Sequence, residues 1–141
     1  ENVIFVQDNQ SLSAQTGTIR GLHYQKEPVP QGKLVRCLKG SIFDVAVDIR
    51  KESDTFGQWV GATLTAAAGE QLWVPEGFAH GFCTLEPDTE VFYKVTNPYS
   101  QPHDAGIAFD DPEIGVVWPI DLSKAVLSDK DKVQPKLASL R

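Results

Sequence analysis

The chain has 141 residues, of which 41% are hydrophobic and 23% are charged, and its formal net charge is −6 at pH 7. This length predicts a single domain, residues 1–141, with a sizeable core. The negative charge argues against a nucleic-acid duplex as a partner, because such binding needs a basic face. No apolar run reaches membrane-spanning length and no secretory leader is expected, so we predict a cytoplasmic protein without membrane contact.

Short runs rich in β-branched and aromatic residues alternate with Gly, Pro, Asn and Asp along the chain, as in an all-β sandwich or barrel. The predicted strands lie at residues 18–25, 33–38, 41–49, 59–64, 71–74, 81–85, 90–96 and 106–109. In the clearest of them, every second side chain from Phe43 to Ile49 is apolar, which predicts one apolar and one mixed face. A helix is expected only near the C-terminus, within residues 128–140, where it would be short.

Strands without helices to cover them must pack as two sheets or close on themselves. We therefore predict a double-sheet jelly roll or β-barrel with a short C-terminal helical segment. Cys37 and Cys83 fall inside apolar runs without CxxC spacing, so both are expected to be buried free thiols. The mouth of such a fold can surround a small ligand with inward-facing polar residues, which makes those residues the candidates for function.

His23 lies in the run RGLHYQ at residues 20–25. On a regular strand Arg20 and His23 would point to opposite faces, because they are an odd number of residues apart. Gly21 lies between them and predicts a bulge, which would bring a cation and a titratable base into one cavity. The alternative is a core histidine bonded to backbone, with Arg20 at the surface.

His80 ends a P-x-G-x-x-H pattern at residues 75–80, in which a tight turn is followed by a strand. The pattern is typical of the cupin superfamily, where such a histidine often binds metal. Those sites usually add an H-x-H pair and a Glu on an earlier hairpin, but residues 33–48 contain no His. Without carboxylate ligands a transition metal would be under-coordinated, so a metal-dependent cupin stands as the alternative to a metal-free site.

The remaining candidates are Lys33, Tyr93 and an acid within SDKD at residues 128–131. Each alone could be a packed or solvated residue. Together with His23 they suit removal of a proton next to a ketone, which needs a base, a cation for the enolate oxygen and an acid on the opposite side. A carboxylate would hold the His base in its useful tautomer. Such a set requires no metal, nicotinamide or nucleophilic serine, and the sequence has no signature for these.

Six runs, in order along essentially the whole chain, resemble the dTDP-4-dehydrorhamnose 3,5-epimerase family. They are FVQDN at 5–9, RGLHYQ at 20–25, QGKLVR at 31–36, FDVAVDIR at 43–50, QLWVPEGFAHGF at 71–82 and LSDKD at 127–131. The resemblance implies a cupin-type jelly roll, usually a homodimer, that acts on dTDP-4-dehydro-6-deoxy-D-glucose without a cofactor. The product would feed dTDP-L-rhamnose synthesis and hence bacterial surface polysaccharides such as lipopolysaccharide.

The resemblance also implies roles for single residues. His23 is the base, Asp131 is its carboxylate partner, and Tyr93 is the acid on the opposite face of the sugar. Lys33 lies near the C4 oxygen, with His80 lining the same pocket. The nucleotide-binding residues implied are Arg20 and Lys130 with the segment Gln7, Asp8 and Asn9 at the pyrophosphate, Tyr99 stacking on the thymine, and Asp104, which stands where the family often has Glu.

Besides Asp104, the chain departs from the family pattern in two further places. Family members carry an N-terminal arm with an R-G-x-F-x-E segment that tends to reach across the dimer, and we expect this chain to lack it. The usual D-N-H-S reads DNQS at residues 8–11. The alternatives to a 3,5-epimerase are a 3- or 5-monoepimerase of a deoxysugar pathway, a metal-dependent cupin, and an inactive fold that binds dTDP-sugars.

Overall fold

The computed structural model describes residues 2–141, and every regular element in that range is a β-strand or a 3-10 turn. In chain order these are β1 (Gln7–Ser13), β2 (Ile19–Gln25), β3 (Lys33–Lys39), β4 (Ser41–Asp48), β5 (Trp59–Thr65), β6 (Gln71–Val74), β7 (Phe78–Thr84), β8 (Thr89–Val95), η1 (Gln101–His103), β9 (Asp104–Gly106), η2 (Leu122–Lys124), η3 (Asp131–Val133) and η4 (Leu137–Leu140). The all-β prediction is confirmed. No helix in the described range has the length and hydropathy needed to cross a bilayer.

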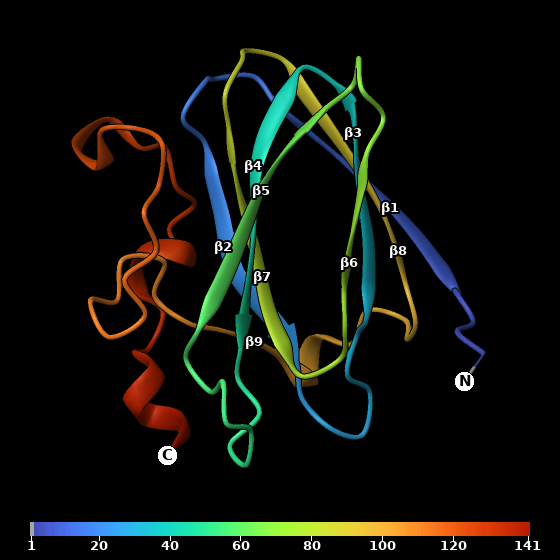
Figure 1. Cartoon of the computed structure of the whole chain (residues 1–141), viewed down its shortest axis with the longest axis vertical. Coiled ribbons are helices and arrows are strands. Elements are labelled where there is room, and N and C mark those ends of the chain that lie inside the picture. The colour runs from blue at the N-terminus through green and yellow to red at the C-terminus, as the bar shows by residue number, and fades with distance from the viewer. Residues whose placement is uncertain (1) are drawn as a thin grey trace.

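The strands form two antiparallel sheets that face each other as a jelly roll (Figure 1). One sheet has the strand order β1-β8-β3-β6, and the other has the order β5-β4-β7-β2-β9. Both orders are non-sequential, so the chain passes repeatedly from one sheet to the other. Strands distant in sequence therefore meet around the space between the sheets.

Two apolar clusters stabilise this arrangement. One lies between the sheets and includes Val35 and Cys37. The other lies on the outer face of the five-stranded sheet, where Cys83 packs in the same cluster as Trp118 and Leu137 of the C-terminal segment. Residues after β9 thus cover this sheet almost without regular structure (Figure 1). Both cysteines are buried and free, as predicted.

Strand β4 runs through the middle of the five-stranded sheet and is buried on both sides. Val45 and Val47 belong to the outer cluster, while Ala46 belongs to the cluster between the sheets. The predicted mixed face therefore points into the sandwich, and it carries Asp44 and Asp48 into full burial. A buried carboxylate needs hydrogen-bond partners, and Asp44 and Asp48 each accept at least one hydrogen bond.

The structure differs from the predicted elements at four places, one of which is the start of strand β7 at Phe78 in place of the predicted residue 81. Strand β1 was not predicted, because QDNQSLS is rich in residues that are poor strand formers. It is held as an edge strand by seven paired positions along β8. Strand β9 lies at Asp104–Gly106, slightly before the predicted 106–109. The C-terminal helical segment consists of two 3-10 turns, since Pro135 forces the preceding Gln134 into extended backbone between them.

Asp48 fixes the loop that follows β4. Its carboxylate accepts hydrogen bonds from the Arg50 guanidinium at 3.0 and 2.9 Å and from the hydroxyls of Ser53, at 2.6 Å, and Thr55. Burial alone would raise the pKa of Asp48, but these donors lower it far below its ordinary value. The ionised Asp48 carboxylate therefore stabilises the loop, because this carboxyl has a lower pKa in the folded protein than in the unfolded chain.

We expect Asp48→Asn to lower the free energy of unfolding by about 1–3 kcal/mol at pH 7, because several donors lose a charged acceptor. Because the pKa of Asp48 is lowered by folding, its ionised form stabilises the folded state fully at pH values above the unfolded pKa of about 3.9. This contribution is lost as the pH falls toward the folded-state pKa. Urea denaturation of both proteins at pH 7 and pH 3 measures the difference. Asp54→Asn, an exposed carboxyl in the same loop, is the control. An Asp48→Asn penalty that is the same at both pH values would contradict this account.

Candidate active site

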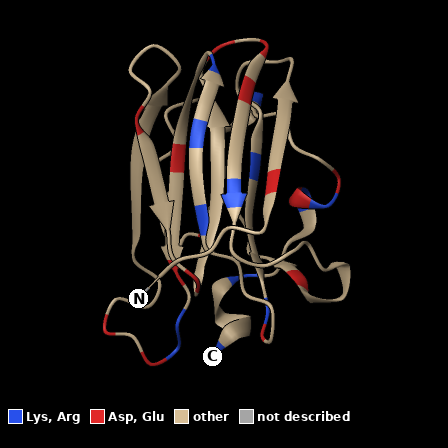
Figure 2. Ribbon diagram, turned by 90° about the vertical axis from the view of Figure 1, so that its right-hand side faces the viewer, with Lys and Arg blue, Asp and Glu red and all other residues tan. Residues whose placement is uncertain are grey.

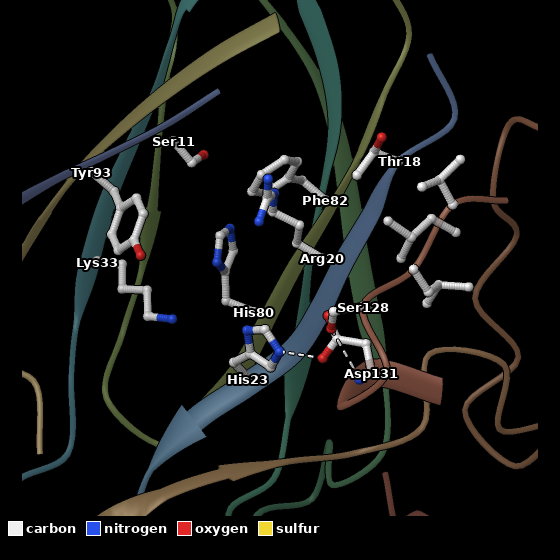
Figure 3. A pocket seen from close by; sticks show the side chains of 13 residues that line it. Ser11, Thr18, Arg20, His23, Lys33, His80, Phe82, Tyr93, Ser128 and Asp131 are labelled. Carbon is white, nitrogen blue, oxygen red and sulfur yellow. Dashed lines mark hydrogen bonds and ion pairs between the residues drawn. The ribbon is translucent and has the colours of Figure 1, made fainter. Parts of the chain in front are cut away.

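A cavity of about 470 Å³ lies between the two sheets (Figure 3). It is lined by Ser11, Thr18, Ile19, Arg20, His23, Lys33, His80, Phe82, Tyr93, Val126, Leu127, Ser128 and Asp131. Strands β1, β3 and β8 supply one wall, strands β2 and β7 supply the other, and residues 126–131 close one side. Six of the residues predicted for the site, including all four predicted for catalysis, therefore meet in one cavity.

The bulge predicted at Gly21 is present and explains how two neighbouring residues of β2 reach the cavity. The register between β2 and β7 shifts between Arg20 and His23, so both side chains line the same space. Gly21 has a φ of +135°, and a Cβ at this position would lie 2.7 Å from the Cα of Gly81. Only glycine fits this backbone conformation and this close approach.

His23 forms a dyad with Asp131. Its Nε2 lies 2.6 Å from Asp131 Oδ1, and the other carboxylate oxygen accepts the Gly21 backbone N–H at 3.2 Å. Burial of Asp131 opposes its charge, but the bonds from His23 and Gly21 lower its pKa below the ordinary value. The His23 side chain is 30% exposed and that of Asp131 is 3% exposed. An ionised carboxylate thus fixes Nε2 as the bonded nitrogen and leaves Nδ1 for a substrate.

A second dyad lies beside the first and was missed from the sequence. His80 Nε2 lies 2.6 Å from Asp44 Oδ1, and Asp44 is 0% exposed. The other oxygen of Asp44 is buried and has no hydrogen-bond partner among the described residues. His80 faces His23 directly across the β2–β7 ladder. The available signal was an Asp in the middle of an apolar strand, but it was interpreted as one residue of an ordinary mixed face.

Lys33 and Tyr93 come from the opposite sheet and face the histidines (Figure 3). The Lys33 ammonium lies 5.7 Å from the centre of the Tyr93 ring. Burial lowers the pKa of Lys33 to about 8, although Asp44 and Asp104 oppose this shift. Burial likewise raises the pKa of the Tyr93 hydroxyl. The cavity therefore holds a proton donor and a cation on one wall and the histidine bases on the other.

Arg20 connects the two sheets at the cavity. Its guanidinium donates to the Ser13 hydroxyl at 3.1 Å and to the Leu12 carbonyl at 3.2 Å, both on β1. A guanidinium has five N–H donors, so donors remain for an anion. Ser11, also on β1, was missed from the sequence. Its buried hydroxyl lines the cavity and has no hydrogen-bond partner within residues 2–141.

The remaining predicted binding residues do not line the cavity. Gln7 accepts the Tyr99 backbone N–H at 3.0 Å and donates to Asn9 at 2.8 Å. Lys130, next to the dyad carboxylate in sequence, forms an ion pair with Asp104 on β9. The Tyr99 ring is 57% exposed. Asp8 points away from the cavity and pairs with Lys94 on the outside of the sheet.

A metal site of the cupin type would need several convergent ligands. Among the described residues, no three His, Cys, Asp or Glu side chains lie together in a way that could hold a metal ion. His23 and His80 instead each direct one nitrogen to a carboxylate. The donor set is arranged for proton transfer.

Comparison with known proteins agrees with this geometry. The sequence profile of the dTDP-4-dehydrorhamnose 3,5-epimerase family matches residues 1–139. A protein of that name from Sinorhizobium fredii is 60% identical over 139 residues, which are 99% of this chain and 71% of the relative. One from Shigella flexneri is 57% identical over 92% of this chain and 70% of the relative.

Solved structures of a dTDP-4-dehydrorhamnose 3,5-epimerase from Bacillus anthracis and of a dTDP-6-deoxy-D-glucose-3,5-epimerase from Legionella pneumophila share the fold. The Bacillus anthracis enzyme with TDP and PPi bound has a TM-score of 0.93 and 52% identity, over 96% of this chain and 77% of that one. The Legionella pneumophila enzyme in complex with dTDP-4-keto-L-rhamnose has a TM-score of 0.92 and 45% identity, over 99% of this chain and 75% of that one. The cupin-type fold and the isomerase class follow from these matches. The chain belongs to the dTDP-4-dehydrorhamnose 3,5-epimerase family.

Proposed function

We propose that this chain epimerises C3 and C5 of dTDP-4-dehydro-6-deoxy-D-glucose to give dTDP-4-dehydro-L-rhamnose, as a step of dTDP-L-rhamnose biosynthesis. The observation that supports this best is the His23–Asp131 dyad facing Tyr93 across the cavity, with the Lys33 ammonium directed into the space between them (Figure 3). Inversion of a carbon requires deprotonation on one face and reprotonation on the other. A base and an acid on opposite sheets meet that requirement.

The base in this proposal is His23, acting through Nδ1. It takes the proton from a carbon next to the C4 ketone, and the C–H electron pair moves into an enolate. Asp131 stabilises the imidazolium that forms, because its charge lies 2.6 Å from Nε2. General base catalysis of this kind typically contributes ~10²–10⁴-fold.

Lys33 stabilises the enolate and Tyr93 completes the inversion. A buried ammonium is effective beside a developing oxyanion, since little water competes for it. The Tyr93 hydroxyl then gives its proton to the opposite face of the carbon and becomes a tyrosinate. C3 and C5 both flank C4, so the same groups serve both positions in turn.

We place the dTDP part of the substrate along Arg20 and the polar residues outside the cavity. Arg20 has unused donors and borders the cavity, which suits a pyrophosphate oxygen. Gln7 and Asn9 lie beside the Tyr99 segment, whose exposed ring offers a face for thymine. The Lys130–Asp104 pair would complete this region.

We further propose a homodimer that uses the outer face of the four-stranded sheet, and a cytoplasmic location. Figure 2 looks onto this sheet and shows positive and negative residues interspersed along its strands. Leu12 and Trp73 are 58% and 41% exposed there, with Phe5 of the N-terminal segment packed edge-on against Trp73. An exposed apolar face with mixed charges suits a second copy of the chain. Free buried thiols fit a reducing compartment.

Prolonged incubation with the dehydro-sugar nucleotide in D₂O, over many reversible turnovers, should place deuterium at both C3 and C5, as detected by NMR. His23→Ala should reduce this exchange ~10²–10⁴-fold. Arg20→Ala should mainly raise KM, since its role is binding. Folded wild-type protein that exchanges neither carbon would disprove the proposed function. Exchange at one carbon alone would identify a monoepimerase.

The kcat/KM of the wild type should fall as the pH rises through about 8. Lys33 is protonated below that pKa and loses its charge above it, so enolate stabilisation is lost on the alkaline side. Lys33→Gln should be slower at all pH values and should lack this alkaline limb. An unchanged limb in Lys33→Gln would assign the titration to another group. The measurement is initial rate against pH from 6 to 10.

Light scattering after gel filtration should give twice the chain mass for the wild type. Leu12→Glu should shift the population toward monomer, because it places a charge on the proposed apolar interface. Val117→Glu makes the same change at an exposed position of the C-terminal segment and should leave the dimer intact. A wild-type monomer, or equal behaviour of the two variants, would argue against this interface.

A further inference from the structure

Two inversions within one bound sugar create a requirement that the groups above do not meet. This requirement arises only if the proposed function is correct. After the first inversion His23 carries the proton that it removed, and Tyr93 has given its proton away. Neither residue can repeat its role at the second carbon until His23 has lost a proton and Tyr93 has gained one. The two groups belong to opposite sheets, so either a proton is carried between them or each group exchanges with solvent.

His80 occupies the position where such a carrier is needed. It is paired with His23 in the β2–β7 ladder, and its ring centre lies 6.5 Å from that of Tyr93. Figure 3 shows the His80 ring between the His23 ring below and Tyr93 on the opposite wall. Its Nε2 is bonded to Asp44, so Nδ1 is the nitrogen available for exchange. Transfer to Tyr93 therefore requires one bridging water or sugar hydroxyl.

Asp44 gives His80 the capacity to hold a proton for a short time. Its carboxylate lies 2.6 Å from Nε2 and has a second, buried oxygen without a hydrogen-bond partner in the described part of the chain. A buried carboxylate in this position stabilises an imidazolium, as Asp131 does for His23. The chemistry at a single carbon already has its base, cation and acid. The Asp44–His80 dyad is therefore left without a task in one inversion.

We propose that His80, supported by Asp44, carries a proton from His23 to Tyr93 between the two inversions and so resets the site while the sugar stays bound. In the first transfer the His23 Nδ1–H bond breaks and a His80 Nδ1–H bond forms. In the second, the His80 Nδ1–H bond breaks and the Tyr93 Oη–H bond forms. His23 and Tyr93 return to their neutral forms, no electrons are transferred, and no co-reactant is consumed.

The surroundings of Tyr93 favour this direction of transfer. Burial raises the pKa of the Tyr93 hydroxyl, so a tyrosinate there takes up a proton readily. The competing route is direct exchange with solvent, since the His23 side chain is 30% exposed. The two routes differ in whether the second inversion depends on His80.

Single-turnover experiments with enzyme in excess separate the two inversions, because any sugar that dissociates after one inversion binds again. Rapid quenching, reduction of the ketone and chromatographic separation of the starting, singly inverted and doubly inverted sugars give the rate constants of the first and second inversion. In His80→Gln we expect the ratio of the second rate constant to the first to fall at least tenfold. Asp44→Asn should show the same selective loss. Circular dichroism and thermal unfolding report whether each variant is folded.

Chemical rescue gives an independent readout. In His80→Ala, added imidazole should restore the second rate constant in proportion to its concentration and leave the first unchanged. Equal loss of both rate constants, or no loss of the second, would overturn the proton relay while leaving the epimerase proposal in place. A wild type that inverts neither carbon would instead overturn the proposed function, and the relay with it.

Discussion

Gly21 and Gly81 lie against each other where β2 passes β7, at a distance that excludes a side chain on either residue. This close approach allows the bulge that turns Arg20 and His23 into the same cavity. It also frees the Gly21 N–H to bond Asp131. One backbone contact thus sets the position of the base and of its cationic neighbour, and helps to hold the carboxylate on which the base depends. The rest of the site is built around that point.

Charge inside the cavity is arranged differently from charge on the chain as a whole. The net charge of −6 would disfavour an anionic sugar nucleotide. However, Asp131 and Asp44 are each engaged with a histidine. Arg20 and Lys33 therefore dominate the local field that a pyrophosphate and an enolate would meet. Local pairing, and not total charge, decides which ligands such a cavity accepts.

Much of the fold and site could be predicted from the sequence where the signal is local. The period-two pattern of β4 and the glycine between Arg20 and His23 are such signals, and both led to correct structure. Strand β1 lacked a local signal, because a polar edge strand is held by its partner and not by its own propensity. The C-terminal turns depended on a proline whose effect exceeds that of the surrounding helix formers.

Contacts between distant segments were harder. Asp131 lies 108 residues from His23, so no spacing rule joins them, and the pairing was available only through family resemblance. For Asp44 the strand could be predicted, but the direction in which its side chain points could not. It lies in a strand that was predicted well, but period two alone cannot say whether a mixed face points to water or into the sandwich. That depends on the C-terminal segment, which covers the other face and leaves Asp44 inside.

The two dyads use the same chemistry but depend on different parts of the fold. Asp44 comes from the middle of β4, between two neighbouring strands, and its histidine is almost fully buried. Asp131 comes from the C-terminal segment, which is attached through the outer apolar cluster and through the bond from the Leu137 N–H to Asp111. Loosening that segment would withdraw the carboxylate from His23 and leave the barrel residues in place. Attachment of the C-terminal segment is therefore a condition for base catalysis as well as for burial of the sheet.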